Sequence, residues 1–284
     1  MSAKLMDGKA LAERVRAEVA EEVRELGELG LATVLVGDDP ASDIYIRRKH
    51  EAGREVGIAT RDSRLPSETS EDELLELVAE LNGDDAIDGI LVQLPLPDHI
   101  DEARIIRAVE PIKDVDGFHP FNAGHLYLGN PTHVPATPLG VVTLLEEYDV
   151  ELQGANAVVV GRSNIVGKPM AMMLLHAHAT VTICHSRTRD LAEHTRRADV
   201  LVVAVGRYGV VGPGDVKAGA AVIDVGMNRT DEGLRGDVDP AAAEVARLIT
   251  PVPGGVGPMT IATLLRNTVR AARYRRSLLA FPGG

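Results

Sequence analysis

Apolar residues in the first third of the chain follow patterns typical of alternating helices and strands. Leu11, Val15, Val19 and Val23 recur at every fourth position, which predicts an amphipathic helix over residues 8–28. The apolar run at 31–36 predicts a buried strand, because turn-forming residues bound it. A second helix is predicted from Ser42, as its N-cap, to about Gly53. A capping box at Ser70 and Glu73 opens a third helix, which continues through Leu81. A strand then begins at Asp88, and Pro95 and Pro97 stop it.

From residue 154 onward the alternation becomes regular. Strands predicted at 156–160, 180–184, 200–205 and 220–225 are strongly apolar, and helices predicted at 170–175 and 190–198 separate them. Such strands are buried on both faces, which favours a parallel sheet between two layers of helices. We therefore predict an α/β protein with an N-terminal α/β domain that holds the substrate, residues 1–121, and a C-terminal Rossmann-like domain with a doubly wound parallel sheet, residues 122–284. A last helix over 259–276 is expected to pack back on the first domain.

Composition narrows the class of protein. The 284 residues carry 42 acidic and 30 basic side chains, and the net charge of −12 disfavours binding to nucleic acid or to an anionic membrane. Cys184 is the only cysteine, which excludes an internal disulfide, and no apolar run approaches the ~20 residues of a membrane span. We therefore expect a cytoplasmic protein. No spacing of His, Cys and Asp suits zinc, so no metal is expected. The one basic cluster, which is either a solvated helix face or a basic patch, contains Arg270, Arg273, Arg275 and Arg276.

A glycine-containing loop lies where a dinucleotide-binding fold holds a pyrophosphate. Gly161 and Gly167 fall between the first strand and the first helix of the second half, where backbone amides and a helix N-terminus favour phosphate. The two glycines are six residues apart, so the G-x-G-x-x-G spacing is absent. A P-loop is the alternative, but the gap before Lys168 is one residue too long, and Pro169 stands where a Ser or Thr must hold magnesium.

The end of the next strand bears on the choice of dinucleotide. A Ser-Arg-Thr sequence at 186–188 follows it, and no carboxylate occurs before Asp190 to hold the ribose hydroxyls of NAD. Hydroxyl and guanidinium groups suit a 2′-phosphate that carries ~−1.5 to −2 charges, so the pattern favours NADP. Arg162 and Ser163 are expected to converge on the same site. The alternative is that these are ordinary surface residues of an NAD enzyme.

Candidate substrate-binding residues occur in the first half. Tyr45 and Lys49 are four residues apart on one face of a predicted helix, and Ser42 lies three residues earlier on that side. A lysine beside an aromatic ring is commonly a snorkelling surface pair. Gln93 places a polar amide at the end of an apolar strand, where it is unexpected unless it contacts a ligand. Segment 113–117, Lys-Asp-Val-Asp-Gly, adds two carboxylates near the predicted domain boundary.

Five motifs, taken in this order, resemble one family. The chain is similar to the bifunctional methylenetetrahydrofolate dehydrogenase/methenyltetrahydrofolate cyclohydrolase family over about residues 5–275. The motifs that carry the resemblance are Ser42-x-x-Tyr45-x-x-x-Lys49, Gln93-Leu94-Pro95-Leu96-Pro97, Lys113-Asp114-Val115-Asp116-Gly117, Gly161-Arg162-Ser163-x-x-Val166-Gly167-x-Pro169, and Pro251-Val-Pro253-Gly-Gly-Val-Gly-Pro258-Met-Thr260.

The resemblance implies a homodimer with a folate domain, an NADP-binding Rossmann domain and a cleft between them, and a place in one-carbon metabolism and purine biosynthesis. The chain departs from the family where Ala136 replaces a cysteine, which excludes an essential thiol there, and at His119-Pro120-Phe121, which leaves the fine substrate preference open. By the same resemblance, the folate would contact Tyr45, Lys49, Val92, Gln93, Leu94, Asp116, Pro253, Gly254, Gly255, Val256 and Gly257, and NADP would contact Gly161, Arg162, Ser163, Ser186, Arg187, Thr188 and Met227.

The implied reactions assign roles to four of these residues. Oxidation of 5,10-methylenetetrahydrofolate leaves a resonance-stabilised cation, which Asp116 would stabilise while Tyr45 stacks on the folate and orients it. Hydrolysis of the methenyl product to 10-formyltetrahydrofolate needs a base. Lys49, in concert with Gln93, is the candidate, since burial and a cationic substrate move an amine pKa from ~10.4 toward ~7 to 8.

Two other functions are compatible with parts of the pattern. One is an NADP oxidoreductase of the shikimate or amino-acid dehydrogenase type, whose site would hold a carboxylate or hydroxy acid with a Lys/Asp pair. The other is a non-catalytic NADP sensor, which need not retain Tyr45, Lys49, Gln93 and Asp116. Activity toward methylenetetrahydrofolate distinguishes the three.

Overall fold

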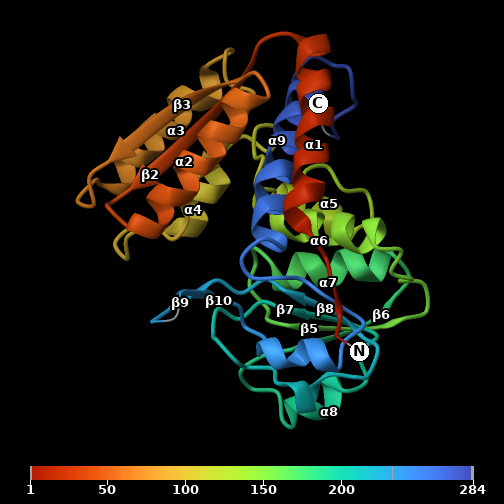
Figure 1. Ribbon diagram of the computed structural model, residues 1–284. Helices are drawn as coiled ribbons and strands as arrows, with labels where there is room; N and C mark the ends of the chain where they lie inside the picture. The colour runs from red at the N-terminus through yellow and green to blue at the C-terminus, as the bar shows by residue number, and fades with distance from the viewer. Residues whose placement is uncertain (1, 232, 283–284) are drawn as a thin grey trace. The chain divides into compact units, whose positions relative to one another are not determined.

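Within the residues that the computed structural model describes, 2–231 and 233–282, the largest sheet has six parallel strands in the order β1, β11, β8, β7, β5, β6 (Figure 1). The central strands β7 and β8 are fully buried. Helix α7 packs on β5 and β6 from one face of the sheet, and α8 contacts β6 from the other. This arrangement confirms the predicted doubly wound sheet. Its elements are β1 (Lys4–Leu5), α6 (Ala136–Glu147), β5 (Asn156–Val160), α7 (Gly167–His176), β6 (Thr180–Cys184), α8 (Leu191–Thr195), β7 (Val200–Val203), η1 (Pro213–Asp215), β8 (Ala221–Asp224), the hairpin β9 (Asn228–Thr230) and β10 (Gly233–Arg235), η2 (Pro240–Glu244) and β11 (Leu248–Ile249).

A second sheet has, among the described residues, three parallel strands in the order β3, β2, β4. The central strand β2 is buried along its whole length, whereas the edge strand β3 keeps most of its positions at least partly exposed. Helices pack around this sheet and build a separate core. Its elements are α1 (Gly8–Leu26), β2 (Leu29–Val36), α2 (Pro40–Glu55), β3 (Ile58–Leu65), α3 (Glu71–Gly83), β4 (Gly89–Val92), α4 (Glu102–Ala108), α5 (Pro120–Tyr127) and α9 (Val256–Arg275).

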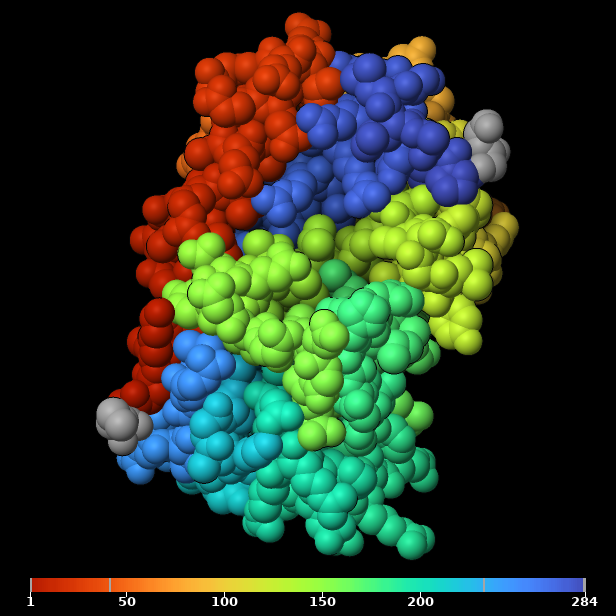
Figure 2. All heavy atoms as spheres, turned by 90° about the vertical axis from the view of Figure 1, so that its right-hand side faces the viewer, coloured from red at the N-terminus to blue at the C-terminus, as the bar shows by residue number. Residues whose placement is uncertain are grey.

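The chain divides into two compact units, one around each sheet. The six-stranded unit contains Met1–Ala12 and Thr137–Thr260, and the three-stranded unit contains Glu13–Ala136 and Ile261–Gly284. From Ile261 onward, α9 lies beside α1 in both views and shares its apolar core (Figures 1 and 2). Asn267 fixes this part of α9, because its Nδ2 donates to the carbonyl oxygens of Val115 and Val134, each at 2.8 Å. The predicted return helix is thus confirmed.

Three details differ from the sequence-based expectations. The predicted division after residue 121 falls after Ala136 in the structure, and the N-terminal residues join the six-stranded unit because Lys4 pairs with Leu248 in the sheet. Ser42 is not the N-cap of α2, since Asp39 takes that position and accepts from the Ser42 amide at 2.8 Å. Strand β3 was not predicted, because its polar edge positions hide the alternation of a buried strand.

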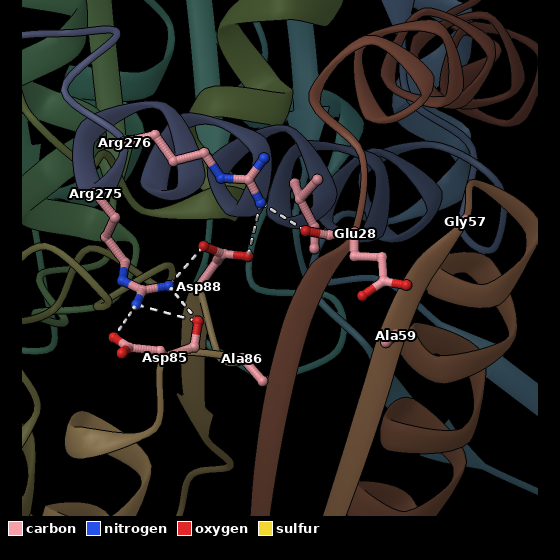
Figure 3. A pocket seen from close by; sticks show the side chains of 9 residues that line it. Glu28, Gly57, Ala59, Asp85, Ala86, Asp88, Arg275 and Arg276 are labelled. Carbon is pink, nitrogen blue, oxygen red and sulfur yellow. Dashed lines mark hydrogen bonds and ion pairs between the residues drawn. The ribbon is translucent and has the colours of Figure 1, made fainter.

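The arginines near the C-terminus are engaged within the fold rather than gathered into a basic patch. Figure 3 shows Arg275 against Asp85 and Asp88, and Arg276 donating to the Glu28 carbonyl just before β2. Arg276 also donates to the Leu26 carbonyl at the end of α1. These groups line a pocket of about 550 Å³, in which Arg275 and Arg276 pair with Asp85 and Asp88. Arg273 likewise pairs with Glu22 on α1 at 2.9 Å. The cluster therefore ties α9 to its neighbours.

Replacing Arg275 by alanine is expected to lower the free energy of unfolding by about 2–4 kcal/mol. Asp88 is only 3% exposed, so the variant leaves its charge buried without the guanidinium that lies 2.7 Å away. Arg24→Ala is the matched control, because the Arg24–Glu21 pair on α1 is exposed, and we expect a change below about 0.5 kcal/mol. Urea unfolding measures both values, and similar losses in the two variants would contradict this role for Arg275.

Candidate active site

Helix α2 presents a buried amine to the end of strand β4. Lys49 is 8% exposed, and its Nζ donates to Oε1 of Gln93 at 3.0 Å. Gln93 follows β4 directly, and its backbone N–H donates to the Val34 carbonyl, which continues the pairing of β4 with β2. Its Nε2 donates to the Leu94 carbonyl at 2.8 Å, which fixes the amide so that Oε1 faces the lysine. The structure thus brings together two residues that lie 44 positions apart in the sequence.

The position of Lys49 depends on its neighbours along α2. His50 is 8% exposed, and its Nε2 lies 2.7 Å from Oγ1 of Thr33, a fully buried residue in the middle of β2. This contact anchors α2 to the sheet at the turn that carries Lys49. Tyr45, one turn earlier, is half-buried, and burial raises the pKa of its phenol. The Tyr45–Lys49 pair is therefore not the solvent-exposed pair that its spacing alone allows.

The charges of Lys49 and Asp116 influence each other. Burial lowers the pKa of the Lys49 amine, and the negative charge of Asp116 acts in the opposite direction. Burial raises the pKa of Asp116 to about 6, and the lysine charge offsets part of that rise while Asp114 adds to it. Both groups thus have pKa values moved toward neutrality, which suits proton transfer and charge stabilisation near neutral pH.

Segment 113–117 holds Asp116 in place through its other residues. Lys113, 2% exposed, donates through Nζ to three carbonyls at the end of α3, at 2.7–3.1 Å. Asp114 accepts from the His119 amide and from Asn122 Nδ2, each at 2.8 Å, so it organises the start of α5. Gly117 has a positive φ of 70°, and a Cβ there would approach the Pro135 nitrogen to 2.8 Å. Of the two carboxylates in the segment, Asp114 is therefore structural.

The order of strands in the six-stranded unit defines where a nucleotide would bind. From β5, the first crossover leads to β6 on one side, and the next leads to β7 on the other side. In open α/β sheets, ligands bind outside the carboxyl ends of the strands at such a switch point. Gly161 follows β5, and a Cβ there would collide with the carbonyl oxygen of Ala204, which follows β7. Its φ of +133° is a conformation that only glycine adopts readily.

The loop after β5 provides a cradle that fits a dinucleotide phosphate. A Cβ at Gly167 would collide with the Gly161 carbonyl, so two glycines keep the loop compact against the start of α7. Ser163 orders the loop from within, since its Oγ accepts from the amides of Val166 and Gly167 at 3.1 and 3.3 Å. The N-cap of α7 has no side-chain hydrogen bond. These features match phosphate binding at a helix N-terminus.

The other predicted cofactor residues lie at the carboxyl ends of neighbouring strands. After β6, Ser186 and Arg187 are exposed, while Oγ1 of Thr188 accepts from the His185 amide at 2.8 Å and shapes the turn. Met227 follows β8 and is 38% exposed. Arg162 is exposed beside Gly161. The predicted folate residues Val92 and Leu94 flank Gln93, whereas 253–257 belong to the six-stranded unit and lead into α9.

Two buried carboxylates beside this region were not singled out from the sequence. Asp224 ends β8 at 4% exposure, and Asp237 is fully buried. A charged residue at the end of an apolar strand was the one signal available for Asp224.

No cluster of three or more potential metal ligands occurs among residues 2–231 and 233–282. No helix in the same described ranges is both long and apolar enough to cross a membrane.

The strand order and glycine loop of the six-stranded unit, and the buried Lys49–Gln93 pair of the three-stranded unit, are typical of a nucleotide-dependent enzyme. The family "Tetrahydrofolate dehydrogenase/cyclohydrolase" matches this chain twice, through its catalytic domain at residues 6–116 and its NAD(P)-binding domain at residues 135–276. The chain therefore belongs to the tetrahydrofolate dehydrogenase/cyclohydrolase family. This membership confirms the family resemblance and the predicted bifunctional enzyme class, and it decides against a dehydrogenase of the shikimate type.

Individual relatives agree with this family over nearly the whole chain. The bifunctional protein FolD of Moorella thermoacetica is 58% identical over 279 residues, which cover 96% of this chain and 100% of that protein. The crystal structure of FolD from Campylobacter jejuni has a TM-score of 0.94 at 48% identity and covers 96% of this chain and 100% of that one. The Trypanosoma brucei enzyme, solved with NADP cofactor and an inhibitor, has a TM-score of 0.93 at 39% identity, with coverages of 99% and 100%.

Proposed function

We propose that this protein oxidises 5,10-methylenetetrahydrofolate to 5,10-methenyltetrahydrofolate with NADP⁺ and then hydrolyses the product to 10-formyltetrahydrofolate. The observation that carries the proposal is the buried Lys49 amine, hydrogen-bonded to Gln93 and coupled to Asp116, in a chain of this family. A non-catalytic NADP sensor would not need to keep a buried amine that interacts with the half-buried Asp116 carboxylate, since both groups lose hydration there.

In the first step, bound NADP⁺ supplies the hydride acceptor. Loss of hydride from the methylene carbon leaves a positive charge shared by two nitrogens. Asp116 stabilises that charge when it is ionised, and it is ionised above its pKa of about 6. Tyr45 stacks on the folate and orients it, which uses an aromatic group that α2 already holds half-buried.

In the second step, Lys49 moves the protons. The neutral amine accepts a proton from water as the oxygen bonds to the methenyl carbon. The ammonium then returns that proton to the ring nitrogen as the carbon–nitrogen bond breaks. The hydroxyl proton passes to water as the formyl group forms, so the positive charge of the methenyl group leaves the site as one proton. Gln93 Oε1 directs Nζ throughout. The burial that lowers the pKa of Lys49 supplies the neutral amine that this sequence requires.

The proposed cofactor is NADP rather than NAD. The exposed Ser186 and Arg187 after β6 supply a hydroxyl and a guanidinium for the 2′-phosphate, and Arg162 adds a second cation from the loop after β5. Gly161, Ser163, Thr188 and Met227 would line the rest of the site. We further propose a cytoplasmic homodimer that supplies one-carbon units for purine biosynthesis and binds neither nucleic acid nor membrane.

The test is an assay of the purified protein with methylenetetrahydrofolate and either NADP⁺ or NAD⁺. Absorbance reports the reduced cofactor, and a second wavelength follows the methenyl product as it forms and is hydrolysed. We expect both reactions, with kcat/KM at least about tenfold higher for NADP⁺, given the strength of charge-assisted bonds to a phosphate. Binding of NADP⁺ without turnover would support the sensor, and equal rates with both cofactors would refute the assignment of 186–188.

A further inference from the structure

Asp237 is a fully buried carboxylate that ties two loops together. Its Oδ2 accepts from the amides of Val205 and Gly206 at 2.6 and 2.9 Å. Its Oδ1 accepts from the amide of Arg207 at 2.8 Å and from Nδ2 of Asn228 at 2.9 Å. All four acceptor positions of the carboxylate are thus used, and the donors come from the segments that follow β7 and β8. A buried charge with this many donors is a built structural feature.

Asp224 holds Asp237 in this position. Its Oδ1 accepts from the amides of Gly226 and Asp237, and its Oδ2 accepts from the amide of Val238, at 2.8–2.9 Å. Thr250 fixes the strand end from the other side, because its Oγ1 accepts from the Asp224 amide at 2.8 Å. The packing is close, since a Cβ at Gly226 would collide with the Asp237 carboxylate. The two aspartates therefore form one rigid assembly.

The segments that Asp237 holds lie at the nucleotide switch point. Val205 and its successors follow β7, directly after Ala204, whose carbonyl contacts the backbone position of Gly161. Met227 lies between Gly226, which is bound to Asp224, and Asn228, which is bound to Asp237. The Asp237 carboxylate thus positions two segments: the loop after β7, which forms one side of the β5/β7 switch point, and the turn that carries Met227.

We infer that Asp237 is a positioning residue for the dinucleotide: it acts through the loops after β7 and β8 and does not touch the cofactor. This inference rests on the proposed NADP-dependent function and adds a residue that sequence reasoning did not reach. The carboxylate determines NADP affinity and the geometry of hydride transfer, whereas hydrolysis of the methenyl substrate uses Lys49 and Gln93 in the three-stranded unit and is independent of it.

The decisive variant is Asp237→Asn. The amide is nearly isosteric but has only one acceptor oxygen, so two of the four donors lose their partner whichever way the side chain turns. We expect the Kd for NADP⁺, measured by calorimetry, and the KM for NADP⁺ to rise about 10-fold to 100-fold. The rate of cyclohydrolysis with methenyltetrahydrofolate supplied directly should stay within about twofold of wild type. Asp239→Asn is the matched control, because Asp239 caps η2 by accepting from Ala241, and its NADP⁺ affinity should not change.

A second variant keeps the test decisive if Asp237→Asn does not fold. Asn228→Ala removes one of the four donors and leaves the three amides after β7 in place, so a smaller rise in the Kd for NADP⁺ is expected. The inference is overturned if Asp237→Asn folds and binds NADP⁺ with the wild-type Kd, or if it loses both activities equally. If only Asn228→Ala folds, an unchanged Kd for NADP⁺ in that variant overturns it. Wild-type protein that binds NADP⁺ without turnover would instead count against the proposed function, because calorimetry reads affinity separately from catalysis.

Discussion

Lys49→Met is expected to reduce the cyclohydrolase rate by about 10²-fold to 10⁴-fold, the range that a positioned general base contributes. The dehydrogenase rate should fall by less than about tenfold, because hydride transfer requires positioning and no proton transfer. Methionine fills a similar volume in the buried site, so α2 keeps its packing. The two rates are measured separately, hydrolysis from the decay of supplied methenyltetrahydrofolate and oxidation from the appearance of NADPH.

Lys49→Arg is the matched control for charge. A guanidinium keeps the positive charge and can donate to Gln93, but it does not lose its proton near neutral pH. If Lys49 acts as the base, the arginine variant hydrolyses as poorly as the methionine variant. If the residue supplies only a positive charge, the arginine variant retains activity. Equal loss of oxidation and hydrolysis in both variants, with folate binding unchanged, would contradict the base role.

The pH dependence of the wild-type enzyme follows from the same two groups. Hydrolysis should speed up as pH rises through the lowered pKa of Lys49, because the neutral amine is the active form. Oxidation should speed up as pH rises through about 6, because Asp116 must be ionised to stabilise the developing cation. Lys49→Arg should abolish the first dependence and leave the second.

The local sequence singled out the residues of the candidate Lys49 site, left a surface pair open as the alternative, and did not show how they meet. Spacing along one helix face placed Tyr45 and Lys49 together, and an amide at the end of an apolar strand marked Gln93. Their meeting at 3.0 Å depends on α2 packing across β2 and β3 so that Lys49 reaches the residue after β4, which no local pattern encodes. Local patterns also did not show that Asp114 has a structural role, because it holds the start of α5 only when His119 and Asn122 fold back onto it.

Features that depend on distant pairing were missed for the same physical reason. The pairing of β1 with β11 joins residues more than 240 positions apart, so the N-terminus was assigned to the wrong side of the division. Strand β3 lies at a sheet edge, where exposed charges replace the apolar run of a central strand. Asp237 carries no local signal, because its partners come from loops up to 32 residues away.

Gly161→Ala is expected to raise the KM for NADP⁺ by about 10²-fold while direct hydrolysis of methenyltetrahydrofolate continues at close to the wild-type rate. The first reason is backbone strain, since φ at Gly161 is +133°, where an L-residue costs about 1–3 kcal/mol. The second is collision of the new Cβ with the Ala204 carbonyl, which pushes the loops after β5 and β7 apart at the switch point. Steady-state kinetics with varied NADP⁺ and calorimetry measure the effect.

Gly154→Ala separates these two causes. Gly154 also has a positive φ, +76°, and lies in the same unit just before β5, but nothing lies within 4 Å of the Cβ position. The variant therefore carries strain without collision, and it should lose about 1 kcal/mol of unfolding free energy with unchanged KM for NADP⁺. If Gly154→Ala weakens NADP⁺ binding as much as Gly161→Ala does, general loss of stability explains both. If only Gly161→Ala does so, the contact between the two loops sets cofactor affinity, as the strand order requires.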